Sequence, residues 1–238
     1  MALPQSQEKA DYVAVMFGRI ARRYDLLNTV MTAGRHHSWR RLATDLAVAR
    51  LEGMGLDVAT GTGDFALELA RRPQVSGVVA LDFSPQMLRV AEAKLRRKRL
   101  ERRVEFILGD ALALPFPDNT FAFVTSGFSL RNVADVGPAF SEMTRVAKPG
   151  GKVVTLEFTP VKGRDPFSRF FPWYFRNVTP RLGALLAADR EAYSYLPSSV
   201  EGFSPAEEVA SIMEKAGLKE VAFRKVALGT LAIHVGRK

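Results

Sequence analysis

The sequence predicts an α/β fold with a seven-stranded, mostly parallel sheet, helices on both faces and an antiparallel last strand. Two observations lead to this prediction. From residue 54 onward, short apolar segments alternate with helical segments, which is typical of parallel strands joined by crossover helices. A glycine turn, Gly61 to Gly63, follows the first apolar segment and immediately precedes a helical one. The length of 238 residues suits one domain with a full hydrophobic core.

The segment before the sheet is predicted to be helical. Apolar residues recur at helical spacing across residues 6–50, with a break at Thr32-Ala33-Gly34. We therefore expect residues 1–50 to form a helical cap on a cofactor-binding core that spans residues 51–159.

Strands and helices alternate within this core. Strands are expected at 54–59, 77–82, 103–108, 121–127 and 151–158. Helices are expected at 64–71, 85–98 and 135–147. Ser84-Pro85 resembles an N-cap followed by proline at the first helical position, and Lys148-Pro149-Gly150-Gly151 resembles a helix stop and turn.

Two further segments complete the predicted domain, which spans residues 1–238. Residues 160–203 interrupt the alternation and carry six aromatic residues with arginines interleaved: Phe167, Phe170, Phe171, Trp173, Tyr174 and Phe175. This insert has two interpretations, a satellite core helix or a lid over an apolar substrate that also touches a membrane surface. Residues 204–238 predict a helix at 205–216 and two strands, 218–227 and 230–236, joined by a hairpin-like link.

Composition excludes several kinds of site. The chain has no cysteine, which rules out disulfides, thiolate metal sites and a cysteine nucleophile, and fits a reducing compartment. Three scattered histidines do not predict a metal site. No apolar run approaches the roughly 20 residues that span a bilayer. The net charge of +9 favours an acidic partner, either nucleic acid or an anionic membrane surface. The basic run at 94–103 also has a plainer interpretation, a solvated helix face.

The glycine turn indicates a ligand site. Gly61 and Gly63 have no Cβ, so the backbone can approach a ligand closely. Dinucleotide sites share this pattern. Asp57 lies inside the preceding apolar strand, and Asp64 stands at the helix N-terminus, where a pyrophosphate would normally bind. Carboxylates on both sides favour a cationic ligand, and S-adenosylmethionine carries an ammonium and a sulfonium without a phosphate.

The ends of the next strands extend this site, because ligands of doubly wound sheets bind at the carboxyl ends of the strands. Asp82 is placed to accept both ribose hydroxyls, since Ser84 already caps the following helix. Asp110 suits the adenine amino group, with a turn aspartate as the alternative. The added acid after the third strand and the antiparallel chain end favour a methyltransferase over a nicotinamide enzyme. The expected cofactor contacts are Asp57, Gly61, Thr62, Gly63, Asp82, Asp110, Ala111 and Ser126.

Several motifs make the comparison specific. They are Tyr24–Asn28, Met31–Trp39, Gly127–Val133, Arg145–Gly151, Leu156–Phe158, Tyr193–Val200 and Gly229–His234. In these motifs, over nearly its whole length, the chain resembles the ubiquinone/menaquinone biosynthesis C-methyltransferases of the demethylmenaquinone methyltransferase type. It departs from the family at Thr32 and Thr159, where serine is usual, and at Ala147, where leucine is usual. Ser129 stands where the family often has glycine, which would alter the shape of the pocket.

The resemblance implies a class I Rossmann-like methyltransferase fold with S-adenosylmethionine as cofactor. It also implies methyl transfer to a ring carbon of a reduced polyprenyl quinone: demethylmenaquinol, with the equivalent ubiquinone step left open. A phenolic ring carbon becomes a good nucleophile when an adjacent hydroxyl loses its proton, so a group must accept or shuttle that proton. The residues expected to act in catalysis are Arg131, Asn132, His36 and Asp25, although a lone histidine is often structural. The residues expected to contact the acceptor are Tyr24, Phe128, Tyr193 and Tyr195.

The sequence disfavours two other functions. A nucleic-acid methyltransferase would need a cysteine nucleophile or an Asn/Asp-Pro-Pro-aromatic turn after the fourth strand, and the chain has neither. A non-catalytic cofactor-binding protein is disfavoured by the intact glycine turn. We therefore expect a cytoplasmic enzyme that touches the inner face of an anionic membrane and binds no nucleic acid. The sequence leaves open whether it forms a homodimer.

Overall fold

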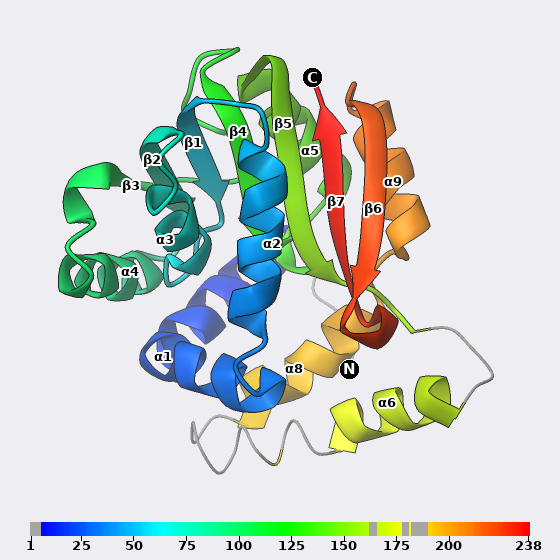
Figure 1. Cartoon of the computed structure of the whole chain (residues 1–238). Coiled ribbons are helices and arrows are strands. Elements are labelled where there is room, and N and C mark those ends of the chain that lie inside the picture. Colours follow the sequence, from blue (N-terminus) through cyan, green and yellow to red (C-terminus); the bar gives the residue numbers. More distant parts are fainter. Residues whose placement is uncertain (1–5, 162–165, 178–180, 182–189) are drawn as a thin grey trace.

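The computed structural model describes residues 6–161, 166–177, 181 and 190–238. Within these residues it contains a 7-stranded sheet with the strand order β3-β2-β1-β4-β5-β7-β6 (Figure 1). The strands are β1 (Gly53–Val58), β2 (Val75–Asp82), β3 (Val104–Leu108), β4 (Phe121–Gly127), β5 (Ala147–Phe158), β6 (Lys219–Val226) and β7 (Leu231–Arg237). The pairs among β1 to β5 are parallel, and β7 runs antiparallel to both of its neighbours. The predicted fold class is confirmed.

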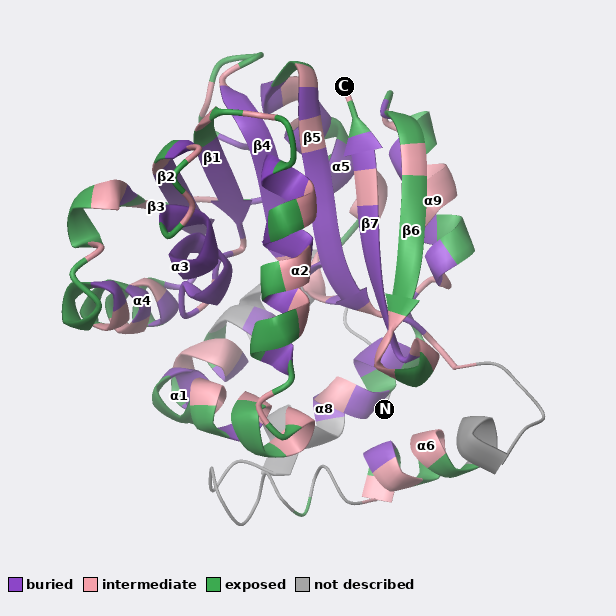
Figure 2. Ribbon diagram, viewed as in Figure 1, coloured by how far each residue is buried: buried purple, intermediate pink, exposed green. Residues whose placement is uncertain are grey.

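Helices cover both faces of the sheet. One face carries α2 (His36–Val48), α3 (Asp64–Ala70) and α4 (Pro85–Arg97), and the other carries α5 (Val136–Val146) and α9 (Ala206–Lys215) (Figure 1). Neighbouring strand residues point to opposite faces, so Phe123 and Val124 of β4 belong to different apolar clusters. The central strands are buried, whereas β6 forms an exposed edge (Figure 2).

The predicted helical cap consists of α1 (Ser6–Thr32) and α2, and the expected break between them is confirmed. Ala33 and Gly34 adopt positive φ angles there, which turns the chain sharply. Helix α1 lies beyond the carboxyl ends of the central strands, next to α8 (Arg190–Glu201) (Figure 1). It packs in a small apolar cluster of its own, formed by Val13, Met16, Ile20 and Leu27 of α1 with Tyr195 of α8.

Most predicted boundaries agree with the structure to within two residues. The exception is β5, which begins at Ala147 rather than at residue 151. The residues Lys148 to Gly151, predicted as a turn, continue the strand through an irregularity in its pairing with β4. Proline and two glycines favour a turn locally, but Ala147 and Lys152 on either side of them both pair with β4, so the segment stays in the strand as an irregularity.

The aromatic insert contributes α6 (Pro166–Asn177). Phe175 is buried, and its ring lies 5.6 Å from the ring of Phe158 at the end of β5. Phe170 and Trp173 are 56% and 57% exposed. One side of α6 therefore packs on the core, while the other faces solvent. Among the described helices, none is both long and apolar enough to cross a bilayer.

Candidate active site

A cavity of about 370 Å³ lies at the carboxyl ends of β1, β2, β3 and β4. The four strand ends that the sequence indicated all contribute to it: the glycine turn, Asp82-Phe83, Gly109 to Leu112, and Gly127 to Ser129. Val13, Phe17 and Tyr24 of α1 form the opposite wall. The cap therefore closes a site that the sheet builds.

The predicted cofactor contacts mostly gather here. Six of the eight line the cavity: Asp57, Gly61, Thr62, Asp82, Asp110 and Ala111. Gly63 does not, and its place is explained by packing, because an added Cβ would lie 3.0 Å from the Cβ of Ala91 in α4. Ser126 is also set back from the cavity, and its hydroxyl donates to the carbonyl of Val58 (2.9 Å). Gly61 has a positive φ of 56° and open space where a side chain would stand.

Asp82 ties two parts of the site together. Its buried carboxylate accepts hydrogen bonds from the backbone N–H groups of Gly61 (2.7 Å) and Ser84 (2.9 Å). Burial raises the pKa of Asp82 to about 6. A carboxylate offers about four acceptor positions, so Asp82 retains capacity for a ligand hydroxyl.

Asp57 supports the glycine turn from beneath. Its oxygens accept hydrogen bonds from the hydroxyls of Thr60 (2.5 Å) and Thr125 (2.9 Å) and from the N–H of Ala66 (3.1 Å). Complete burial raises the pKa of Asp57 to about 7, although these hydrogen bonds oppose the shift. These hydrogen bonds of Asp57 thus hold the loop, and within the described part of the chain no cation forms an ion pair with its carboxylate.

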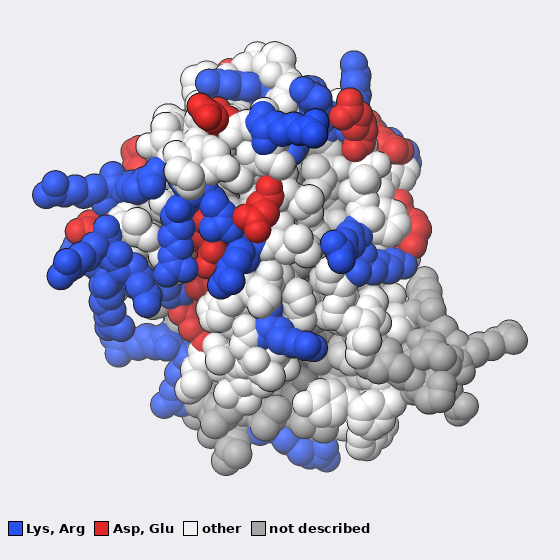
Figure 3. Space-filling model, viewed as in Figure 1, with Lys and Arg blue, Asp and Glu red and all other residues white. Residues whose placement is uncertain are grey.

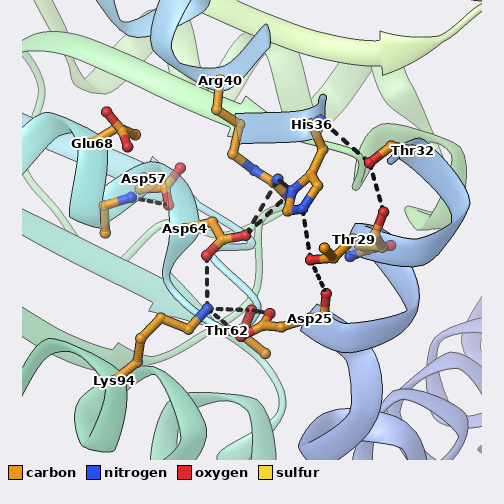
Figure 4. Close-up of polar contacts among 12 residues, drawn as sticks. Asp25, Thr29, Thr32, His36, Arg40, Asp57, Thr62, Asp64, Glu68 and Lys94 are labelled. Atoms are coloured by element: carbon orange, nitrogen blue, oxygen red, sulfur yellow. Dashed lines mark hydrogen bonds and ion pairs between the residues drawn. The ribbon is translucent and has the colours of Figure 1, made fainter. Parts of the chain in front are cut away.

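Asp64 corrects one step of the sequence argument. It was expected to favour a cationic ligand, but Lys94 Nζ lies 2.7 Å from Asp64 Oδ1 and Arg40 Nη1 lies 3.3 Å from Oδ2 (Figure 4). Burial alone would raise the pKa of Asp64, yet Arg40 and Lys94 outweigh it and lower that pKa to about 2. The chain's own cations therefore balance this carboxylate.

Arg40 and Lys94 were not predicted from the sequence to be part of the site, although the position of each in its helix indicates that it is partly buried. Arg40 is buried and shares a helical stripe with His36, Ala43 and Ala47. An arginine in a buried stripe needs a carboxylate partner. Lys94 stands beside Leu95, on the buried side of α4, and so could reach inward.

His36 was predicted to take up a proton, but both ring nitrogens are engaged. Arg40 can only donate, so Nδ1 of His36 accepts its hydrogen bond. The Thr29 hydroxyl donates to the carbonyl of Asp25 (2.7 Å), so it accepts from Nε2 of His36 (3.2 Å). Burial and the charge of Arg40 lower the pKa of His36 to about 4. The geometry therefore gives a neutral, structural histidine and does not support the predicted role.

Asp25 was likewise predicted to act in catalysis. Its carboxylate accepts a hydrogen bond from the Thr62 hydroxyl (2.6 Å) and pairs with Lys94 Nζ (2.6 Å). Asp25 lines neither this cavity nor the one described next. Its contacts fasten α1 to the glycine turn and to α4, which is a structural arrangement.

Most of the side-chain atoms that could bind a metal ion near this cavity already contact other residues. His36, His37 and Asp64 could each offer one ligand atom, and these atoms lie within 4.8 Å of one another. However, the contacts of Arg40 and Lys94 already engage His36 and Asp64.

A second, smaller cavity of about 50 Å³ adjoins the first. It lies between α1, α8 and the short 3-10 turn η2 (Leu130–Asn132). Three of the four predicted acceptor contacts line it: Tyr24, Phe128 and Tyr195. The side chain of the fourth, Tyr193, lies outside the described residues. Phe17, Tyr24 and Phe128 line both cavities, so they form the partition between them.

Phe128 is held in an unusual conformation at this partition. Its φ of 60° places a bulky residue in the left-handed region, which is strained and is often found at functional sites. Its N–H donates to the carbonyl of Leu156 (2.8 Å), and its own carbonyl accepts from Arg131 Nη1 (2.6 Å). Arg40 lies over its ring at 5.1 Å. These contacts fix the ring between the two cavities.

Arg131 and Asn132 were predicted to act together, but they face different cavities. Arg131 lines the second cavity and forms a buried ion pair with Glu157, whose Oε1 lies 2.7 Å from its Nη1. Asn132 lines the first cavity. Its buried Oδ1 has no hydrogen-bond partner among the described residues. A buried acceptor of this kind calls for a donor from a ligand.

Comparisons with known sequences agree with this geometry. The model of the ubiE/COQ5 methyltransferase family matches residues 5–238. The chain is 45% identical to the demethylmenaquinone methyltransferase of Roseiflexus castenholzii, over 99% of this chain and 97% of that protein. It is 46% identical to the Deinococcus radiodurans protein of the same name, over 98% and 95%. It is 38% identical to the ubiquinone/menaquinone biosynthesis C-methyltransferase UbiE of Escherichia coli O1:K1 / APEC, over 98% and 92%.

Solved structures share the fold at lower identity. An S-adenosylmethionine-dependent methyltransferase from Aquifex aeolicus superposes with a TM-score of 0.56 at 21% identity, covering 79% of this chain and 84% of that one. Phosphoethanolamine N-methyltransferase 2 of Haemonchus contortus, solved with S-adenosylmethionine, gives 0.63 at 16% identity, covering 84% and 52%. The [4+2]-cyclase SpnF gives 0.64 at 19% identity, covering 100% and 98%. These likenesses concern the fold alone.

Proposed function

We propose, because the chain belongs to the ubiE/COQ5 methyltransferase family, that it methylates a ring carbon of a reduced polyprenyl quinone, with S-adenosylmethionine as the methyl donor. The observation that carries this proposal is the pair of adjoining cavities, separated by Phe128 and both closed by α1. Demethylmenaquinol is the favoured acceptor, since relatives named for menaquinone alone share more of this sequence than the Escherichia coli enzyme.

The first cavity fits the methyl donor. The open space beside Gly61 lets the backbone approach a ligand. Asp82 would accept ribose hydroxyls, while Asp110 and Ala111 would hold the adenine at the end of β3. When bound, S-adenosylmethionine supplies an electrophilic methyl group on a sulfonium.

The second cavity suits the ring and the start of an apolar tail. Its lining is largely apolar: Met16, Phe17, Ile20, Met31, Phe128, Phe158 and Leu196 contribute. The side chains of Phe17 and Tyr24 exclude water from the partition, which keeps the reacting carbon away from competing nucleophiles. Alignment of that carbon with the methyl donor is then a matter of positioning.

Asn132 and Arg131 have different roles in positioning the acceptor. Asn132 lines the first cavity, so its Oδ1 atom would accept a hydrogen bond from the acceptor hydroxyl next to the reacting carbon where the ring reaches past Phe128 toward the methyl donor. Arg131 acts as a positioning residue, because Glu157 balances its charge and its Nη1 holds the carbonyl of Phe128. Neither role requires His36 or Asp25.

A transfer assay tests this function. The purified enzyme is incubated with methyl-labelled S-adenosylmethionine and either reduced demethylmenaquinone or a host RNA fraction. We expect the label in the lipid extract, and label in RNA alone would contradict the proposal. Asn132→Ala should lower kcat while the calorimetric affinity for S-adenosylmethionine is retained. An equal loss of both would mean that Asn132 shapes the cofactor cavity instead.

We also propose that this enzyme works at the cytoplasmic face of an anionic membrane, because its acceptor dissolves in lipid. Phe170 and Trp173 expose large aromatic surfaces on α6, with Arg176 exposed nearby. Lys and Arg side chains also gather over α4 and the turn after it, at the left of Figure 3. The exposed members of this basic patch are Arg89, Arg96, Arg97, Lys98, Arg99 and Arg102. Each basic residue near an anionic surface contributes about 1 kcal/mol.

Liposome flotation tests the membrane contact. Binding should require anionic lipid, weaken with salt, and fall when Phe170 and Trp173 are both replaced by serine. Phe171 is left intact because it stacks on Phe175, so its loss would disturb packing. Met54→Ser is the matched control, since Met54 is 40% exposed at the amino end of β1. Equal flotation of the double variant and the control would limit α6 to a packing role.

A further inference from the structure

Six residues from four helices form a closed ring of polar contacts beside the cofactor cavity, one link of which is the hydrogen bond from the Thr29 hydroxyl to the backbone carbonyl of Asp25 (Figure 4). They are Asp25 and Thr29 of α1, His36 and Arg40 of α2, Asp64 of α3 and Lys94 of α4. Lys94 closes the ring, because its Nζ lies 2.6 Å from Asp25 Oδ2 and 2.7 Å from Asp64 Oδ1. The Thr62 hydroxyl of the glycine turn joins the ring through Asp25 (2.6 Å) and Lys94 (3.2 Å).

The buried apolar cluster of α1 is separate from the clusters that flank the sheet, although α1 also touches α4, α2 and η2. The buried apolar cluster of α1 draws on α8 and includes no strand residue. Among the residues whose side chains the structure describes, the two clusters that flank the sheet include none from α1. Movement of α1 together with α8 therefore leaves the core packing of the sheet intact.

Turnover requires such a movement. Val13, Phe17 and Tyr24 of α1 wall the cofactor cavity. The acceptor cavity holds only about 50 Å³, whereas sites for small molecules usually measure roughly 300–1,000 Å³. A prenylated ring cannot enter this space unless a wall moves, and α1 contributes most of the residues that line it.

Two contacts of the ring join α1 to the other helices: the ion pair of Asp25 with Lys94 (2.6 Å) and the longer, neutral hydrogen bond between Thr29 and His36 (3.2 Å). Asp64 is only 8% exposed at its side chain and is held by Arg40 as well as Lys94. Asp25 is 36% exposed at its side chain. If α1 lifts, Lys94 keeps its buried partner Asp64, while water solvates Asp25. The cost of breaking the exposed contact is therefore much smaller than that of stranding a buried charge.

We propose that Lys94 is a positioning residue that latches α1 over the bound cofactor. The contact between Lys94 and Asp25 opens to release S-adenosylhomocysteine and admit the acceptor. Because Thr62 contacts both partners, opening also loosens the glycine turn on the side that faces the ligand. This inference rests on S-adenosylmethionine-dependent transfer and not on which quinone is methylated.

The first test measures the dissociation rate of S-adenosylhomocysteine by chasing the radiolabelled product with unlabelled S-adenosylmethionine. Lys94→Met should speed release about two- to fivefold, as expected for loss of a partly exposed ion pair. Lys94→Arg should restore slow release. Asp25→Asn should resemble Lys94→Met, and the double variant should release no faster than either single one. The matched control is Arg96→Met, which removes an exposed ion pair with Glu92 on the same helix.

The second test does not depend on how well the Lys94 variants fold. The chain has no cysteine, and a Cβ added at Gly18 of α1 would lie 3.7 Å from Gln86 Cγ of α4. Gly18→Cys with Gln86→Cys should therefore form a disulfide that locks α1 closed. Oxidation should slow the exchange of labelled S-adenosylhomocysteine, and reduction should restore it, with Gly18→Cys alone as the control.

Two results would overturn the latch: equal exchange rates in the oxidised and reduced double-cysteine protein, or wild-type release from a folded Lys94→Met variant. If the proposed acceptor were wrong, a different measurement would change. The release kinetics would still follow the latch, while methyl transfer to the quinol would fail in the wild-type enzyme.

Discussion

Replacing Glu157 by glutamine should destabilise the protein more than replacing Glu157 and Arg131 together by apolar residues. The side chains of Arg131 and Glu157 are 4% and 1% exposed, and their nearest charged atoms lie 2.7 Å apart. Desolvation of two buried charges largely offsets their attraction, so the pair adds little net stability. Either charge left alone in the same place is far more costly.

The contacts of the two side chains determine how much free energy of unfolding each variant should lose. In Glu157→Gln the guanidinium keeps the carbonyl of Phe128 (2.6 Å) and the ring of Phe158, 5.3 Å from its carbon. The amide oxygen of the new side chain can also accept one hydrogen bond. We therefore expect a loss of about 2–4 kcal/mol, near the lower end of the range for a broken buried pair. Arg131→Met with Glu157→Leu removes both charges, the bond from Arg131 to the carbonyl of Phe128 and the bond from the N–H of Phe158 to Glu157 (2.8 Å), and should lose about 1–2 kcal/mol.

Urea denaturation at pH 7, followed by circular dichroism, gives both numbers. The wild-type free energy of unfolding should lie at roughly 5–15 kcal/mol, so all variants should remain folded. A loss below about 1 kcal/mol for Glu157→Gln would refute the reasoning, as would a double variant that loses as much as the sum of the single ones. Turnover adds a second check: if Arg131 positions Phe128, the double variant keeps more activity than Glu157→Gln, whereas a proton-transferring Arg131 predicts the reverse.

Three other outcomes follow from the site. Asp82→Ala should weaken S-adenosylmethionine binding by about 1–3 kcal/mol in calorimetry, and unchanged affinity in a folded protein would reject the ribose assignment. Burial raises the pKa of Asp57 from 3.8 to about 7, so the folded state holds a proton that the unfolded chain releases. The free energy of unfolding should therefore fall from pH 4 to pH 7 in the wild type relative to Asp57→Asn, and a flat difference would contradict this. His36→Gln should lower the melting temperature yet leave the shape of the pH–kcat profile between pH 5 and 8 unchanged; loss of one limb would restore His36 as a base.

The sheet and the cofactor side of the site were predictable because topology alone brings their parts together. Once the alternation of strands and helices is recognised, the carboxyl ends of parallel strands must meet at one edge. Asp82 and Asp110 each end a strand, so both could be placed at that edge without knowing any side-chain contact.

The roles of Asp64, His36 and Asp25 could not be predicted in the same way. Whether a carboxylate is available to a ligand depends on which cations reach it. Lys94 reaches Asp64 across 30 residues of sequence, through the docking of α4 against α1 and α3. The sequence showed a charged helix end, and only the structure shows that one of its lysines turns inward.

We expect the cap and its neighbours, rather than the sheet, to determine the choice of acceptor. The SpnF structure covers 100% of this chain with a TM-score of 0.64, yet its name describes a cyclase, so a shared sheet does not select a reaction. In this chain the walls of the acceptor cavity come mainly from α1, α8 and η2. All three lie outside the strands, where helices can change without breaking the pairing that builds the cofactor site. Helix α8 lines the second cavity and not the first, so exchanging α8 with that of a relative named for both quinones should move acceptor preference while leaving cofactor affinity in place.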